Sequence, residues 1–166
     1  MQPLLDLAIG YCRVGLFPVP IPFRQKNPVL KGWQKLRITE ETAPQYFNSK
    51  PANVGALLGI DGLTDIDQDC AEARGGADIF LPPSGFRFGR RSAPDSHWFY
   101  RVNRSLAYRK FTDSLRDGGE DKATLLEIRS TAGHQTVLPG SIHPTGESIE
   151  FSPGATYSAN RRCGDS

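Results

Sequence analysis

The stretch LTDIDQD, residues 63–69, places two carboxylates, Asp65 and Asp67, on either side of one isoleucine. It follows NVGALLGIDG, which is apolar and rich in residues that favour strands. Residues i and i+2 of a strand point to the same side, so the two aspartates should project together. Two like charges this close raise the pKa of one carboxyl group unless a cation lies between them. A divalent metal ion would resolve the conflict, and oxygen ligands favour magnesium or manganese over zinc.

A third acid, Glu127, lies in the apolar segment TLLEIRS. Glu127 and Arg129 share a face by the same alternation, so two strands could present three carboxylates and one guanidinium to one cleft. An Asp-x-Asp pair on its own is often only a solvated strand end, and Glu127 can simply pair with Arg129 or with a lysine. The spacing alone leaves these structural interpretations open.

Two further segments carry groups that could bind phosphate. In SAPDSHWFY, Ser96 and His97 can both donate to a phosphate, although a histidine here can also be a core residue with a backbone partner. In LPGSIHPTGE, Ser141 and His143 follow a predicted strand on a loop bounded by Pro and Gly. Such loops can offer backbone amides to anions, but many are plain turns.

The basic run FRFGRRS contains Arg87, Arg90 and Arg91. It could follow a phosphate backbone, or it could be only a solvated surface. The net charge of +2 and the pI near 8.5 permit an anionic partner without demonstrating one.

Composition describes an ordinary globular chain. With 166 residues, 38% of them hydrophobic and 23% charged, it is long enough for one domain with a core. Thirteen prolines and 17 glycines favour short strands and ordered loops over a helical bundle. Three widely spaced cysteines offer neither a zinc motif nor a disulfide framework. No signal peptide or membrane-length apolar run is evident, so a cytoplasmic protein without a membrane partner is expected.

The elements that must position these groups are short. The pattern predicts helices over 2–15 and 39–48, the second capped by Thr39, a helical turn or short helix over 68–80, and an extended segment over 16–23. Strands are predicted over 53–60, 63–67, 97–102, 124–130, 134–140 and 148–151. A turn is expected at Asp61-Gly62, and residues 103–122 are expected to form a loop. Strands and helices without regular βαβ alternation indicate the α+β class.

Together these segments resemble the bifunctional DNA primase/polymerase N-terminal domain of the archaeo-eukaryotic primase superfamily. The signatures of that family are an acidic pair at a strand end, a Ser-His motif and a third acid on a later strand, and they occur here in order as LTDID, DSHWFY and LLEIR. KNPVLKGWQKLRITEE, NVGALLG and EIRSTAGHQTVLPGSIHPTGESIEF resemble further parts, so the resemblance covers about residues 3–152. One glycine interrupts the late Pro-Ser-x-His loop, the zinc-binding stem of some relatives is absent, and 68–91 and 103–122 match no signature.

The resemblance implies a two-module α+β core over residues 1–155, with a modified RNA-recognition-motif-like sheet that is antiparallel or mixed, and a tail or linker over 156–166. It implies that Asp65, Asp67 and Glu127 are the catalytic ligands of two Mg²⁺ or Mn²⁺ ions, with no zinc. The nucleotide would be held by Ser96, His97, Arg129, Ser141 and His143. Weaker candidates for nucleic-acid contact are Lys31, Trp33, Arg87, Arg90 and Arg91.

The implied activity is template-dependent nucleotidyl transfer by the DNA primase or polymerase of a replication protein, from NTP or dNTP to a 3′-hydroxyl. The implied partners are a single-stranded DNA template, a primer strand, and a helicase or other replication domain that follows this segment. Two alternatives stay open: a metal-dependent phosphodiesterase or nuclease using the same acids, and a non-catalytic replication-initiator module that binds DNA. A relaxase would need a tyrosine nucleophile and clustered histidines. His134 and His143 are predicted to lie on opposite sides of a strand-and-loop segment, so a relaxase is the least favoured alternative.

Overall fold

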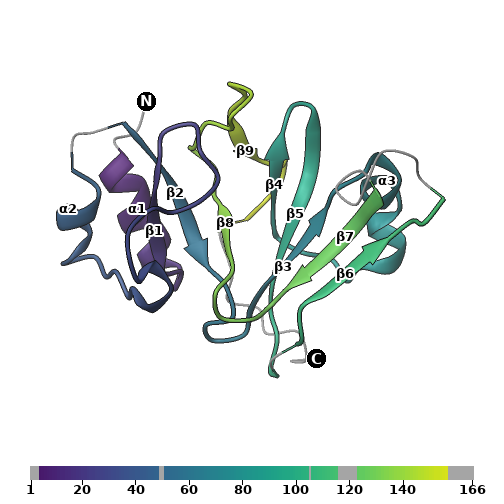
Figure 1. The fold of residues 1–166 in the computed structure, drawn as a ribbon, viewed down its shortest axis with the longest axis horizontal. Helices are drawn as coiled ribbons and strands as arrows, with labels where there is room; N and C mark the ends of the chain where they lie inside the picture. The colour runs from purple at the N-terminus through teal and green to yellow at the C-terminus, as the bar shows by residue number, and fades with distance from the viewer. Residues whose placement is uncertain (1–3, 49–50, 105, 116–122, 157–166) are drawn as a thin grey trace.

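The computed structural model describes residues 4–48, 51–104, 106–115 and 123–156 (Figure 1). Its helices are α1 (Leu4–Arg13), the 3₁₀ helix η1 (Trp33–Lys35), α2 (Ala43–Tyr46) and α3 (Ala71–Phe80). Its strands are β1 (Pro18–Pro22), β2 (Ala52–Leu57), β3 (Leu63–Gln68), β4 (Phe86–Arg90), β5 (Ala93–Arg101), β6 (Arg109–Thr112), β7 (Thr124–Arg129), β8 (Gln135–Val137) and β9 (Ile149–Phe151). The α+β prediction is confirmed.

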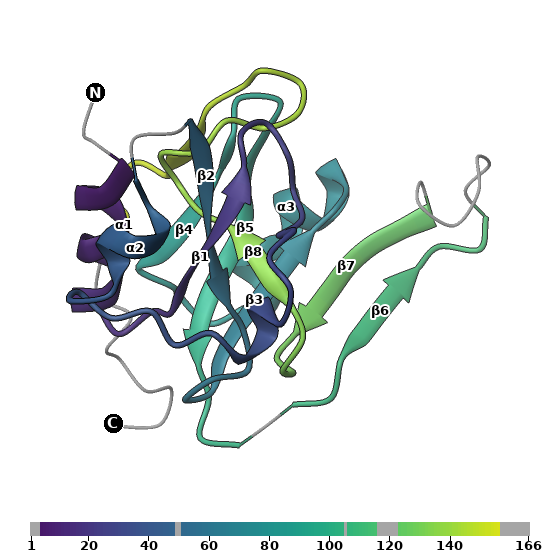
Figure 2. The ribbon, with the colours of Figure 1, turned by 60° about the vertical axis from the view of Figure 1, so that its left-hand side comes forward.

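The strands form two sheets, ordered β1-β2-β8 and β6-β7-β3-β5-β4-β9, and every described pairing in them is antiparallel. The RNA-recognition-motif-like arrangement remains a prediction. Figures 1 and 2 show α1 and α2 on the outer side of the three-stranded sheet, and α3 at the opposite end of the molecule.

The three-stranded sheet follows from local sequence rules. Helix α1 ends in a Schellman motif, in which Gly15 (φ 77°) donates to Cys12 O and Leu16 donates to Tyr11 O. Strand β1 carries alternate prolines, which lack the N–H of a ladder and are therefore suited to an edge strand. The Tyr11 hydroxyl donates to Pro139 O at 2.8 Å, which joins α1 to the loop after β8.

The six-stranded sheet has two different faces. One face packs against α3, where Ile66 and Trp98 meet Ala77 in a small apolar cluster. The other face turns toward the three-stranded sheet. Under β4 and β5 that face is aromatic, and Phe88 and Phe99 join the main hydrophobic core.

Several sequence predictions need correction. Residues 86–90 form strand β4 rather than a plain basic run, and the predicted loop over 103–122 contains edge strand β6, which pairs with β7. Sequence reasoning missed β6 because all four of its residues are exposed, so it shows no apolar alternation. Helix α2 begins at Ala43, with Thr42 as its N-cap, instead of being capped by Thr39.

The predicted turn at Asp61-Gly62 is present, with φ of 49° and 72°. It joins β2 and β3, which lie in different sheets, so it is not the turn of a hairpin. A Cβ at Gly62 would lie 2.0 Å from Val102 O, so the close approach of the two segments requires glycine.

Thr156, at the start of the predicted tail, still donates from its backbone to Gly85 O at 2.6 Å. The rest of that tail and part of the predicted 103–122 loop lie outside the described residues. Among the described residues, the helices are too short or too polar to cross a bilayer.

Candidate active site

Strand β3 lies between β5 and β7 and carries the acidic pair. Asp67 is directly opposite Glu127 on β7 and His97 on β5, and Asp65 is directly opposite Arg129 on β7. Directly opposite residues of an antiparallel pair point to the same face. These five side chains therefore share the face that turns toward the three-stranded sheet, and the predicted joint projection of Asp65 and Asp67 is present.

Asp65 is fully buried and is held by three donors. Its Oδ2 accepts from Arg129 Nη2 at 2.6 Å, from Thr136 Oγ1 at 2.6 Å and, at 3.1 Å, faces His97 Nδ1. Burial raises the pKa of Asp65, but the charges of His97 and Arg129 and the hydrogen bonds outweigh it and lower that pKa to about 2. Asp65 is thus a carboxylate whose partners all come from the protein.

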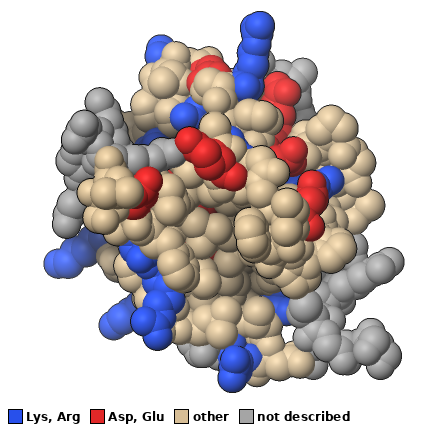
Figure 3. Space-filling model, turned by 90° about the vertical axis from the view of Figure 1, so that its right-hand side faces the viewer, with Lys and Arg blue, Asp and Glu red and all other residues tan. Residues whose placement is uncertain are grey.

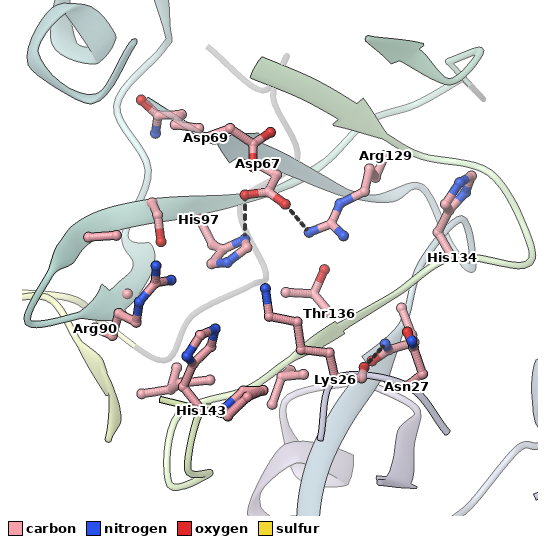
Figure 4. A pocket seen from close by; sticks show the side chains of 18 of the residues that line it. Lys26, Asn27, Asp67, Asp69, Arg90, His97, Arg129, His134, Thr136 and His143 are labelled. Atoms are coloured by element: carbon pink, nitrogen blue, oxygen red, sulfur yellow. Dashed lines mark hydrogen bonds and ion pairs between the residues drawn. The ribbon is translucent and has the colours of Figure 1, made fainter. Parts of the chain in front are cut away.

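Arg129 and His97 also reach Asp67 (Figure 4). Arg129 Nη2 lies 2.8 Å from Asp67 Oδ2, and His97 Nδ1 lies 3.5 Å from Asp67 Oδ1. Burial lowers the pKa of His97, but Asp67 and Asp65 outweigh it and raise that pKa above its ordinary value. Arg129, and His97 when it is protonated, therefore supply positive charge between the two aspartates, where the sequence indicated a cation.

A second group of carboxylates lies near the C-terminal end of β3, where Asp67 and Asp69 meet Glu127 of β7. Oxygen atoms of Asp67, Asp69 and Glu127 lie within 4.8 Å of one another, and this group is more open to solvent than Asp65. Burial, and then the charges of Asp67 and Glu127, raise the pKa of Asp69 to about 6. The Tyr108 hydroxyl donates to Glu127 Oε1 at 2.8 Å.

Two overlapping groups could hold a divalent cation, and Asp67 belongs to both. Asp65, Asp67 and His97 offer ligand atoms within 4.8 Å of one another, as do Asp67, Asp69 and Glu127. The second group consists of carboxylates alone, which suits a hard cation such as Mg²⁺ or Mn²⁺. In the first group Arg129 already contacts both aspartates.

A cleft of about 580 Å³ separates the acidic strand from the three-stranded sheet. Figure 4 shows Asp67, His97 and Arg129 on one side of it and Lys26 rising from the other. The lining includes these predicted site residues: Asp67, Ser96, His97, Arg129, His143, Arg90 and Trp33. The other predicted site residues are not among the lining residues: Asp65, Glu127, Ser141, Lys31, Arg87 and Arg91. Asp65 nevertheless accepts hydrogen bonds from the lining residues Arg129 and Thr136, and a Glu127 oxygen lies within 4.8 Å of oxygens of Asp67 and Asp69.

Ser141 and His143 have different surroundings on the loop after β8. The Ser141 hydroxyl is buried, accepts from Val54 N at 3.0 Å and donates to Val54 O at 3.2 Å, so it fixes the loop to β2. His143 lines the cleft. Both residues were predicted to hold the nucleotide, but of the two only His143 lines the cleft.

The basic run does not form one surface. The Arg87 guanidinium lies 5.0 Å from the ring of Trp98 and 3.9 Å from Asp78, on the face that packs against α3. Arg90 follows an irregularity in β4 and lines the cleft on the other face. Figure 3 shows acidic side chains across the upper part of the side where α3 and β6 lie, and basic ones mostly below and at its edges.

Sequence reasoning missed three residues of the site. Asp69 continues the i, i+2 series of Asp65 and Asp67, so the alternation itself could have indicated it. Thr136 comes from β8 in the other sheet, and Tyr108 precedes β6 and stacks on His134 with ring centroids 5.1 Å apart. Their approach depends on tertiary packing, for which the sequence offers no local signal.

A family model described as bifunctional DNA primase/polymerase, N-terminal, matches residues 8–161. The chain belongs to this family. The match spans both sheets and the cleft between them, and it supports a primase/polymerase type of nucleotidyltransferase in general. No curated protein matches the chain.

Proposed function

We propose that this primase/polymerase domain catalyses template-dependent transfer of a nucleoside monophosphate from NTP or dNTP to a 3′-hydroxyl, with pyrophosphate as the leaving group. The observation that carries the proposal is that two groups of potential metal ligands share Asp67, which lines a cleft, in a chain of this family. A cleft of about 580 Å³ lies within the usual size of small-ligand sites.

The resemblance implies Asp65, Asp67 and Glu127 as ligands of the two metal ions, and the geometry adds Asp69. Because Asp65 already accepts from Arg129 and Thr136, it would anchor the site, while Asp67, Asp69 and Glu127 would hold the ions. The set is composed of carboxylate oxygens, which fits Mg²⁺ or Mn²⁺. When bound, these ions lower the pKa of the attacking hydroxyl and stabilise the departing pyrophosphate.

The protein's own residues would mainly position and neutralise. Protonated His97 and Arg129 lie beside Asp67, where they could donate to the phosphates of an incoming nucleotide, with Ser96 at the same wall. His143 would contact the nucleotide from the opposite wall, and Ser141 would act by holding that loop against β2.

Template and primer would approach along the cleft, with Trp33 at its lining as a candidate for stacking on a base. Lys31, Arg87 and Arg91 lie outside the lining and are weaker candidates for phosphate contacts. A helicase or other replication domain following this segment remains our expectation for the whole replication protein.

The test is extension of primed and unprimed single-stranded templates, with NTP or dNTP offered alone and Mg²⁺ or Mn²⁺ present. We expect Asp67→Asn to lower the rate by about 10³-fold or more, equal to roughly 4 kcal/mol of barrier. Asp78→Asn, which neutralises an exposed acid on α3 far from the carboxylate groups, is the matched control.

The same assay separates the alternatives. Metal-dependent cleavage of labelled DNA without extension would replace the proposal by a phosphodiesterase. DNA binding with neither extension nor cleavage would replace it by a non-catalytic initiator module.

A further inference from the structure

Strand β2 and the segment that follows β8 stay joined after their ladder ends, through an exchange of side-chain hydrogen bonds. The Ser141 hydroxyl accepts from Val54 N at 3.0 Å and donates to Val54 O at 3.2 Å. In return, Asn53 Nδ2 donates to Ile142 O at 2.8 Å, and Asn53 Oδ1 accepts from Ile142 N at 3.0 Å. A side-chain amide carries the same donor and acceptor as a peptide group, so Asn53 takes the place of a strand residue opposite Ile142.

Asn53 also reaches a second segment. Its Nδ2 donates to Gln25 O at 3.1 Å, on the loop that follows β1. Asn53 is fully buried, and its two N–H groups and its oxygen each have a backbone partner. An amide offers two donors and an acceptor from one planar group, so an aspartate of the same size would lose both donors. Asn53 therefore connects two loops that are far apart in the sequence.

The two loops that Asn53 connects both contribute to the wall of the cleft. We call residues 23–28 the early loop and residues 138–148 the late loop. The lining includes these residues of the two loops: Gln25, Lys26, Asn27, Pro28, His143 and Pro144. Asn53 is not among the lining residues of this cleft, so it would act on a bound molecule only through the loops.

A second bond between the loops lies at the surface. Arg24 Nη2 donates to Pro144 O at 3.0 Å, and this contact is exposed. An exposed hydrogen bond competes with water, whereas breaking the buried bonds of Asn53 would leave backbone groups without partners. Asn53 is thus the stronger of these two connections.

We propose that Asn53 is a positioning residue that holds the early and late loops together as one cooperative unit of the cleft wall. The inference rests on the proposed function for what the cleft receives, a nucleotide, whereas the coupling of the loops does not depend on it. Segments that open as one unit share a single opening free energy, so a change that weakens the unit speeds amide exchange in all its parts by the same factor. Independent loops would respond one at a time.

The first test is amide hydrogen exchange of the whole chain, followed residue by residue by NMR. Gln25 N–H, which donates to Pro22 O, reports on the early loop, and His143 N–H, which donates to Glu147 O, reports on the late loop. Ser141→Ala removes two hydrogen bonds between the late loop and β2 and leaves the Asn53 amide in place. We expect it to speed exchange at both reporting amides by the same factor, about tenfold.

The second test changes the connecting side chain itself. Asn53→Asp keeps the size of the side chain but removes both donors, so we expect a larger rise in exchange, again shared by the two loops. In primer extension, we expect its KM for dNTP to rise about tenfold with kcat nearly unchanged, because the wall is displaced while the carboxylates are not. Val54→Ala removes core packing from the next residue of β2 and is the control, with a lower melting temperature but an unchanged KM.

Faster exchange in the late loop alone after Ser141→Ala would overturn the coupling, and this comparison decides it even if Asn53→Asp does not fold. Equal KM values for Asn53→Asp and Val54→Ala would overturn the positioning role, because the amide would then only stabilise the fold. A wild-type protein that never extends a primer would lose the proposed function, and the exchange comparison would still decide whether the loops form one unit.

Discussion

Asp65 lies within the inner strand β3 and Asp69 directly follows its end, four residues later, yet the two have opposite surroundings. Asp65 is buried among Arg129, His97 and Thr136, which hold its pKa near 2. Burial, and then the charges of Asp67 and Glu127, raise the pKa of Asp69 to about 6. The inner carboxylate is completed by the protein, whereas in the outer group Arg129 and His97 contact Asp67 and the pKa of Asp69 stays raised.

The difference teaches that an acid in a metal-binding motif can have two kinds of role. An inner acid can fix the cations and the strand that the site is built on. An outer acid lies beside other negative charges, and a bound metal ion would neutralise the repulsion between them. Three substitutions test this division, and they are ordered by the size of the expected effect.

Asp65→Asn should cause the largest change, in the stability of the metal-free protein. It removes the charge that compensates buried Arg129 and His97, and an uncompensated buried charge costs about 3 kcal/mol or more. We expect the melting temperature in EDTA to fall by roughly 6–12 °C. Asp67→Asn, at a partly exposed position, should have a clearly smaller effect. Equal melting of the Asp65 variant and wild type would show that Asp65 is not the anchor.

Tyr108→Phe should act on the outer group alone. The ring can still stack on His134, but the hydrogen bond to Glu127 is lost. We expect Mn²⁺ affinity to fall up to about tenfold, as for other residues that orient a metal ligand, with the melting temperature unchanged. A lower melting temperature with unaltered Mn²⁺ titration would assign Tyr108 to packing instead.

Asp69→Asn should produce the smallest effect, and its sign depends on pH. Because the folded pKa is raised from an ordinary value of 3.8 to about 6, the native protein binds more protons than the unfolded chain between those values. Stability therefore falls as the pH rises through this window and stays lower above it. Removing the charge should raise the melting temperature of the metal-free protein at pH 7.5 by about 1–2 °C, since exposure screens the repulsion.

The comparison between pH values is the control for this variant. The gain should vanish at a pH well below the ordinary value of 3.8, where Asp69 is protonated in both the folded and the unfolded state. With saturating Mn²⁺ the variant should instead be less stable than wild type, because a ligand has been lost. A gain that persists at low pH would mean that the substitution acts through something other than charge.

Much of this site could be predicted from alternation along single strands. The shared face of Asp65 and Asp67, and that of Glu127 and Arg129, follows from strand periodicity alone. The α+β class and most of the strands were also predictable from their apolar pattern. What alternation cannot supply is which strands are neighbours, so the contact of Arg129 with both aspartates required the register of β3 and β7.

The other differences between prediction and structure also have physical causes. All residues of strand β6 are exposed, so its sequence shows no apolar alternation, and the arginines of β4 made that strand resemble a basic loop. Thr136 and Lys26 reach the cleft from the second sheet and its loop, so only packing between sheets brings them near Asp67. The shared face of residues on one strand was predictable, whereas the approach of Thr136 and Lys26 from the other sheet was not.

The sharing of Arg129 between Asp65 and Asp67 has a practical consequence. With His97 protonated, two negative and two positive charges balance inside the sheet before any ion arrives. A chelating agent should therefore remove bound metal ions and leave the chain folded. The protein can be purified and stored in EDTA, and then titrated from a defined empty starting state.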